Sequence, residues 1–122
     1  MSNYVPDRGD VVWVDFNPQA GHEQAGRRPA LVLSPREFNH RMKVAFVCPI
    51  TNQPKGIPFE VPVPVGSKVT GVVLCQHAKS IDWRARQVSF LCRLDDETIN
   101  EVSGRVLSFV DPEGVFSSML ED

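Results

Sequence analysis

Short runs of β-branched and alternating residues, separated by turn signals, fill the first 94 positions of this chain and constrain its fold most strongly. Such runs predict β-strands, and six of them can be traced. They cover residues 11–16, 29–34, 42–50, 58–65, 71–75 and 87–94. Six short strands joined by turns predict a small, mainly β barrel.

Prolines and polar stretches set the character of the remaining segments. Pro58, Pro62 and Pro64 lack the N–H that a β ladder needs, so the fourth strand is expected at a sheet edge or in a β-ribbon. A single helical turn is expected at residues 36–40. A polar connection is expected between the fifth strand and the sixth.

The hydrophobic period becomes helical near residue 95. Asp95, Asp96 and Glu97 supply an N-cap and negative charge where the helix dipole is positive. Gly104 indicates either a close packing contact or a weak point in this helix. Apolar residues then recur at helical spacing at Ile99, Val102, Val106, Phe109 and Val110.

The length of 122 residues suffices for one domain but not for two. Residues 1–110 are therefore expected to form a single domain, and residues 111–122 a short acidic tail. The tail carries Phe116, Met119 and Leu120 at helical spacing, but it is too short to fold by itself.

Composition narrows the class of protein. With 42% hydrophobic and 23% charged residues, the chain is expected to be globular rather than disordered. Its apolar runs fall far short of the ~20 residues of a membrane span, and no signal peptide opens the chain, so we expect a cytoplasmic protein without membrane contact. Cys48, Cys75 and Cys92 form no C-x-x-C pair, which favours buried, inert thiols.

The net charge of −2 hides a strong asymmetry. Residues 1–93 carry 12 basic and 7 acidic side chains, a net +5, whereas residues 94–122 carry 1 and 8, a net −7. A basic barrel is compatible with a nucleic-acid groove. The acidic end suggests the hypothesis that the tail shields that groove.

The polar segment between the first two strands contains a potential base and potential phosphate-binding cations. Cleavage of RNA by its own 2′-hydroxyl needs a base, a cation for the phosphorane and a proton donor for the leaving oxygen. Glu23 could be the base, and Arg28 could hold two phosphate oxygens through its planar fork. A solvated surface pair is the common alternative for such residues.

The end of the third strand offers a second set of candidates. Thr51 could donate to a phosphate oxygen, or simply cap the following turn. Asn52, Gln53 and Lys55 could contact bases and phosphates, or only face water. Trp83 could stack on an unpaired base or anchor the barrel rim. The histidines have no metal-ligand spacing, so no metal site is expected.

Four ordered motifs, at residues 8–16, 23–30, 49–56 and 79–86, closely resemble the MazF (PemK-like) toxins of bacterial toxin-antitoxin pairs. The resemblance extends from about Tyr4 to about Val110. It implies an SH3-like barrel of the plasmid-maintenance toxin type, with a C-terminal helix, that forms a homodimer. It also implies a cofactor-free, metal-independent endoribonuclease that cuts single-stranded RNA and leaves 2′,3′-cyclic phosphate and 5′-hydroxyl ends.

The resemblance implies a small MazE-like antitoxin as partner, whose acidic tail would cover the RNA groove. The toxin would contact promoter DNA only through this antitoxin. The essential arginine of the family falls on Arg28, its threonine on Thr51 and its loop glutamate on Glu23. RNA binding is further expected from Gln24, Arg27, Asn52, Gln53, Lys55, Gln76, His77, Lys79 and Arg84.

One departure from the family pattern leaves the general base open. Many members carry an acidic residue just before the Lys-Ser-Ile-like motif, where this chain has Gln76 and His77. Either Glu23 takes the proton here, or His77 does, or Arg28 acts mainly electrostatically.

Two other functions have to be weighed. A CcdB-like toxin on the same barrel would bind gyrase without cutting RNA, but that group needs a C-terminal Trp-Gly-Ile, and this chain ends Met119-Leu120-Glu121-Asp122. An SH3-like peptide-binding module would need an aromatic groove. One Tyr and two Trp supply such a groove poorly.

Overall fold

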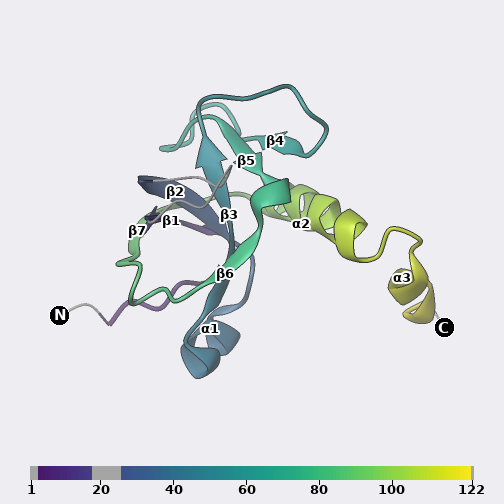
Figure 1. Ribbon diagram of the computed structural model, residues 1–122, viewed down its shortest axis with the longest axis horizontal. Helices are drawn as coiled ribbons and strands as arrows, with labels where there is room; N and C mark the ends of the chain where they lie inside the picture. Colours follow the sequence, from purple (N-terminus) through teal and green to yellow (C-terminus); the bar gives the residue numbers. More distant parts are fainter. Residues whose placement is uncertain (1–2, 18–25, 122) are drawn as a thin grey trace.

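The computed structural model describes residues 3–17 and 26–121. Within these ranges it contains seven strands, a 3-10 turn and three helices (Figure 1). The elements are β1 (Asp10–Asp15), β2 (Arg27–Val32), α1 (Arg36–Met42), β3 (Ala45–Thr51), β4 (Glu60–Pro62), β5 (Val72–Leu74), η1 (Cys75–His77), β6 (Lys79–Ile81), β7 (Ser89–Arg93), α2 (Asp96–Val110) and α3 (Val115–Met119).

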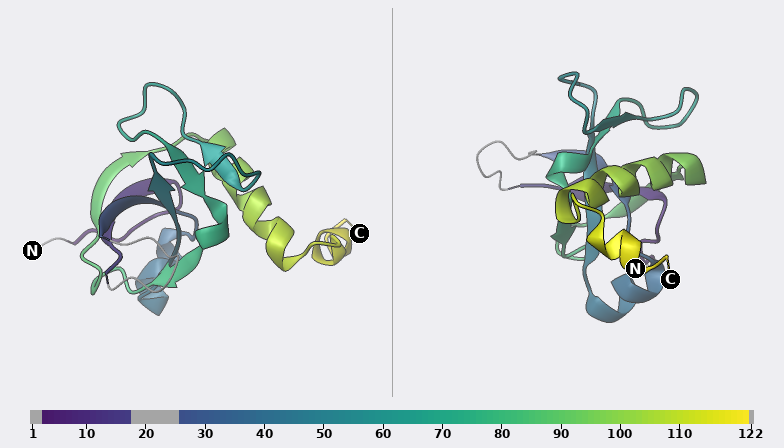
Figure 2. Two further views of the ribbon diagram at one scale, coloured as in Figure 1. Left: turned by 45° about the horizontal axis from the view of Figure 1, so that its top comes forward. Right: turned by 90° about the vertical axis from the view of Figure 1, so that its right-hand side faces the viewer.

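The strands form one antiparallel sheet in the order β4-β5-β3-β2-β1-β7, and β6 pairs with β3. The sheet curves around itself into a barrel-like shape (Figure 2). The mainly β class, the barrel and the C-terminal helix are therefore confirmed. The proline-rich strand β4 lies at one end of the strand order, at an edge as predicted.

Alternation along the strands divides the apolar side chains into two clusters. Val11 of β1 and Leu31 of β2 belong to the cluster that α2 covers through Ile99 and Val102. A second cluster, on the opposite face, contains Val12, Val14, Phe16, Ala30, Val32, Ala45, Val47, Ile81 and Trp83. Because successive side chains of a strand face opposite sides, both faces of β1 and β2 are held in place.

The structure corrects three details. Residues 79–81 form strand β6 rather than part of a polar connection, because they continue the pairing with β3. Helix α1 extends to Met42, and strand β3 begins only at Ala45, because Lys43 adopts a left-handed conformation (φ 62°) that ends the helix. A Cβ at Gly104 would meet nothing within 4 Å, so this glycine makes no close packing contact.

The acidic tail forms helix α3, which projects from the end of α2 (Figures 1 and 2). The Asp111 carboxylate caps it by accepting hydrogen bonds from the N–H groups of Val115, Phe116 and Ser117. All residues of α3 are exposed. The helix lies on the far side of α2 from β1 and β2, so the tail does not shield the basic barrel in this structure.

No helix in the described part of the chain is both long and apolar enough to cross a membrane.

Candidate active site

A pocket of about 380 Å³ opens where β1, β2 and β3 meet the loop between β4 and β5. Its cationic side chains are Arg27, Arg28 and Lys68, and no carboxylate from residues 3–17 or 26–121 lines it. The pocket is therefore suited to an anion. Its full lining is Trp13, Arg27, Arg28, Pro29, Ile50, Thr51, Asn52, Gln53, Lys68, Val69, Thr70 and Leu91.

Strand register brings Arg28 and Thr51 together in this pocket. Arg28 pairs with Val14 of β1, and Thr51 pairs with Val72 of β5. Strands β2 and β3 pair Ala30 with Pro49, and Arg28 and Thr51 each lie two residues farther toward the same end of this ladder, on the same faces as Ala30 and Pro49. Directly opposite residues in an antiparallel pair project to the same face, so the two candidate catalytic side chains share one face.

Thr51 is held tightly at the end of β3. Its side chain is buried, and its Oγ1 accepts a hydrogen bond from the Gln53 N–H at 3.1 Å. The turn-capping role considered from the sequence is thus present. A hydroxyl that accepts one bond still has its own hydrogen to donate, so capping leaves Thr51 able to bind a phosphate oxygen.

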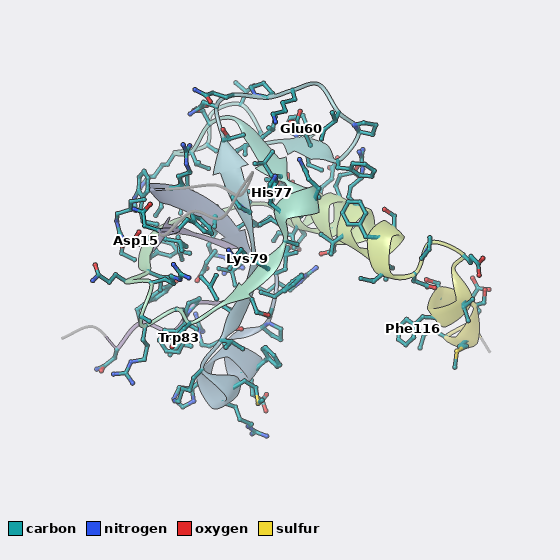
Figure 3. The ribbon with its side chains drawn as sticks, viewed as in Figure 1. Asp15, Glu60, His77, Lys79, Trp83 and Phe116 are labelled. Atoms are coloured by element: carbon teal, nitrogen blue, oxygen red, sulfur yellow. The ribbon has the colours of Figure 1, made fainter. Side chains whose placement is uncertain are left out.

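A smaller cleft of about 40 Å³ shares Thr51 and Gln53 with the main pocket. It is also lined by Lys55, Glu60, Leu74, Gln76 and His77. The Glu60 carboxylate accepts hydrogen bonds from the N–H groups of Lys55 and Gly56 at 2.9 Å, which fixes the loop that follows Thr51. Figure 3 shows Glu60 on β4 and His77 on η1, the turn that directly follows β5.

The remaining predicted residues lie elsewhere. Arg84 lines a different pocket with Tyr4, Trp83, Gln87 and Val88. Lys79 lies on β6, with its ammonium 5.8 Å from the centre of the Phe16 ring. Glu23 and Gln24 lie outside the described residues.

Trp83 is a structural anchor. Its side chain is only 7% exposed, and its Nε1–H donates to the Asn39 carbonyl at 3.0 Å. Among the cysteines, Cys48 and Cys75 are buried and Cys92 is partly buried. Burial raises the pKa of the Cys75 thiol to about 11 and also raises that of Cys48, so both are protonated and unreactive at neutral pH.

Sequence reasoning missed seven lining residues: Trp13, Pro29, Ile50, Lys68, Val69, Thr70 and Leu91. A signal existed for Trp13, because Val12 and Val14 on either side of it face a buried cluster and alternation turns Trp13 the other way. Lys68 and Thr70 lie in the loop between β4 and β5, where no hydrophobic periodicity predicts which way a side chain points.

The family model for the PemK-like, MazF-like toxins of type II toxin-antitoxin systems matches residues 7–110. The chain belongs to this family. Within it, the chain is 54% identical over 86 residues to the endoribonuclease toxin MazF of Escherichia coli K12, covering 70% of this chain and 77% of that protein. It is 38% identical over 104 residues to the E. coli endoribonuclease PemK, covering 82% and 78%.

Solved structures of the family share the fold described above. MazF of Deinococcus radiodurans superimposes with a TM-score of 0.86 at 48% identity, over 88% of this chain and 98% of that one. A MazE-MazF crystal structure from the same organism matches with a TM-score of 0.79 at 46% identity, over 88% and 97%.

Proposed function

We propose that this endoribonuclease toxin cuts single-stranded RNA in the 380 Å³ pocket. The observation that carries the proposal is that Arg28 and Thr51 line one pocket, which also holds Arg27 and Lys68. A base removes the proton of the 2′-hydroxyl, and the 2′-oxygen attacks the adjacent phosphorus. The bond from phosphorus to the 5′-oxygen breaks, and that 5′-oxygen receives a proton. The products are a 2′,3′-cyclic phosphate and a 5′-hydroxyl.

Arg28 and Thr51 act on the phosphate in this mechanism. The phosphorane carries two negative charges, and a guanidinium can bind two of its oxygens while staying charged at every working pH. The Thr51 hydroxyl donates to a phosphate oxygen and fixes the linkage in place. Because Arg28 supplies the cation, the proposed reaction needs no metal ion.

Glu23 and His77 are the two candidates for the general base, and the third alternative is that Arg28 acts mainly electrostatically. The sequence motif puts Glu23 at the position of the family's loop glutamate. His77 lines the small cleft that Thr51 also lines. Gln76 cannot take a proton in place of the acidic residue of other members. The pH dependence of cleavage by Glu23→Gln and His77→Gln distinguishes the two.

The polar residues around the pocket bind the RNA on either side of the cut. Arg27, Asn52 and Gln53 line the main pocket. The smaller cleft is lined by Lys55, Gln76 and His77. Gln24, Lys79 and Arg84 are proposed to bind RNA as well, and Arg84 does so from a separate pocket.

We further propose that the chain forms a homodimer in the cytoplasm and is neutralised by a MazE-like antitoxin, which would also provide its only link to promoter DNA. The MazE-MazF structures of D. radiodurans support this partner. The basic lining of the pocket would attract an acidic antitoxin segment.

The deciding experiment incubates the purified protein with a long single-stranded RNA in EDTA. Cleavage to 2′,3′-cyclic phosphate ends is expected, and Arg28→Ala should slow it by about 10²–10³-fold because it removes one preorganised charge at the transition state. Arg41→Ala, which removes an equal charge from α1, serves as the control. Intact RNA, or equal rates for wild type and Arg28→Ala, would contradict the proposal. A gyrase supercoiling assay tests the CcdB-like alternative.

A further inference from the structure

The pocket has an apolar wall that the proposed cleavage does not use. It is formed by Trp13, Pro29, Ile50, Val69 and Leu91. Trp13 pairs directly with Pro29, and Ile50 pairs with Val73. Trp13 and Pro29 therefore share one face of the sheet, whereas Arg28, which pairs with Val14, projects to the other face. Both sets of side chains nevertheless line the pocket, because it opens at the start of β2 and the end of β3.

Trp13 is exposed in a way that packing does not explain. The Val12 and Val14 side chains on either side of it are fully buried, whereas Trp13 is 37% exposed. Within residues 3–17 and 26–121, its indole N–H has no hydrogen-bond partner, while the indole of Trp83 is buried and bonded to Asn39. Large aromatic side chains that stay open at the wall of a polar pocket are typical of ligand contacts.

We propose that Trp13 stacks on an unpaired nucleobase of the RNA next to the phosphate that is cut. This proposal rests on the proposed function. It assigns the apolar wall of the pocket to a base of the RNA, and the cationic side chains to the RNA's phosphates. Every base has a π-face, so an indole binds single-stranded RNA without regard to base identity. Paired bases are already stacked and cannot reach the indole, so this wall also selects single strands over duplexes.

The position of Trp13 suits one nucleotide bound across both walls. Pro29, its cross-strand partner, directly follows Arg28 in β2, and Arg27 lies two residues away on the same face as Pro29. The Arg27 guanidinium is held by the Gln87 carbonyl at 3.0 Å and the Ser89 hydroxyl at 3.1 Å, beside the Ser89 that pairs with Trp13. Arg27 therefore supplies a cation on the Trp13 face of the pocket for the phosphate of a base stacked on Trp13.

Fluorescence tests the proposal, because the chain contains two tryptophans in different environments. Wild type, Trp13→Phe and Trp83→Phe are titrated with a single-stranded RNA whose 2′-hydroxyls are methylated, so that it binds without being cut. Quenching is expected in wild type and Trp83→Phe and absent in Trp13→Phe. If Trp83→Phe fails to fold, the difference between wild type and Trp13→Phe gives the same answer.

Cleavage kinetics provide the second measurement. Loss of one stacked base should raise KM for Trp13→Ala by roughly 5- to 150-fold while kcat stays within about threefold. Trp13→Phe should keep most of the affinity, since phenylalanine also stacks. An abasic site at the stacked position of the RNA should raise KM for wild type but not further for Trp13→Ala.

Three outcomes would overturn the stacking proposal while leaving the proposed function intact. The first is RNA binding, measured by anisotropy, that does not quench Trp13 fluorescence. The second is an unchanged KM for Trp13→Ala, and the third is an equal loss of activity for Trp13→Phe and Trp13→Ala. If wild type neither binds nor cuts RNA, the proposed function itself fails, and the stacking proposal fails with it.

Discussion

Gly71 lies directly against the backbone of Thr51. A Cβ at Gly71 would lie 2.8 Å from the Thr51 carbonyl carbon and closer still to its oxygen, and 3.0 Å from Asn52 Oδ1. Gly71 also has a φ of +113°, which L side chains rarely adopt. The Thr70 hydroxyl and Asn52 Oδ1 are 2.9 Å apart, so the loop before β5 supports the pocket residues that follow β3.

Gly71→Ala should therefore damage the site as well as the fold. We expect the free energy of unfolding to fall by roughly 2 kcal/mol or more, and kcat to fall at least tenfold because Thr51 must move. Gly66→Ala is the matched control, since Gly66 also has a positive φ (+94°) but a Cβ there meets nothing within 4 Å. Equal effects of the two substitutions on kcat would show that Gly71 does not position Thr51.

Lys68 should contribute an electrostatic contact to RNA. It is exposed on the loop between β4 and β5 and lines the pocket with Arg27 and Arg28. Lys68→Ala is expected to weaken RNA binding and to reduce the slope of log Kd against log salt by about 0.7, the value for one phosphate contact on a single strand. Arg41→Ala removes the same charge on α1 and should leave the slope unchanged; an equal change in both would indicate only a general charge effect.

Asn39 should stabilise the fold without affecting catalysis. It is fully buried, and its Nδ2 donates to the carbonyls of Pro6 at 2.8 Å and Ser34 at 3.0 Å. Asn39→Ala leaves these carbonyls without their donor, which should cost about 2–4 kcal/mol in urea unfolding. At a temperature where the variant is folded, kcat should match wild type. A loss of activity in the folded variant would contradict the separation of Asn39 from the site.

The stability of α2 should depend on pH through Asp95. The side chain accepts hydrogen bonds from the Thr98 hydroxyl at 2.6 Å and the Thr98 N–H at 3.4 Å, and the bond from the hydroxyl is the main cause that lowers the pKa of Asp95. A folded-state pKa below the unfolded one adds stability above the unfolded pKa of about 3.9, and this stability is lost as pH falls through the lower folded value.

Asp95→Ala should accordingly lower Tm at pH 7, and the difference from wild type should shrink as pH falls below about 4. Thermal melts followed by circular dichroism between pH 7 and pH 2.5 measure it. Glu113→Ala, in the exposed segment between α2 and α3, is the control. A Tm difference that stays constant over this range would exclude the carboxylate as the source of the effect.

The local pattern of the sequence determined much of the fold. Alternation marked six of the seven strands found in residues 3–17 and 26–121, Asp95 marked the start of α2, and the three prolines marked β4 as an edge strand. These features depend on a residue and its near neighbours, so the sequence alone can reveal them. Strand β6 was missed because its three residues become a strand only through pairing with β3.

The candidate site, like the fold, was determined partly by the sequence alone and partly by the tertiary structure. Arg28 and Thr51 could be proposed from residue type and motif, because their chemistry belongs to the side chains themselves. Their meeting in one pocket, the contact of Gly71 with Thr51, and the opening of Trp13 into the same pocket depend on strand pairing and on a loop some 17 to 20 residues after Thr51. Residues far apart in the chain meet only when the sheet closes, so the tertiary structure alone decided which side chains share the pocket.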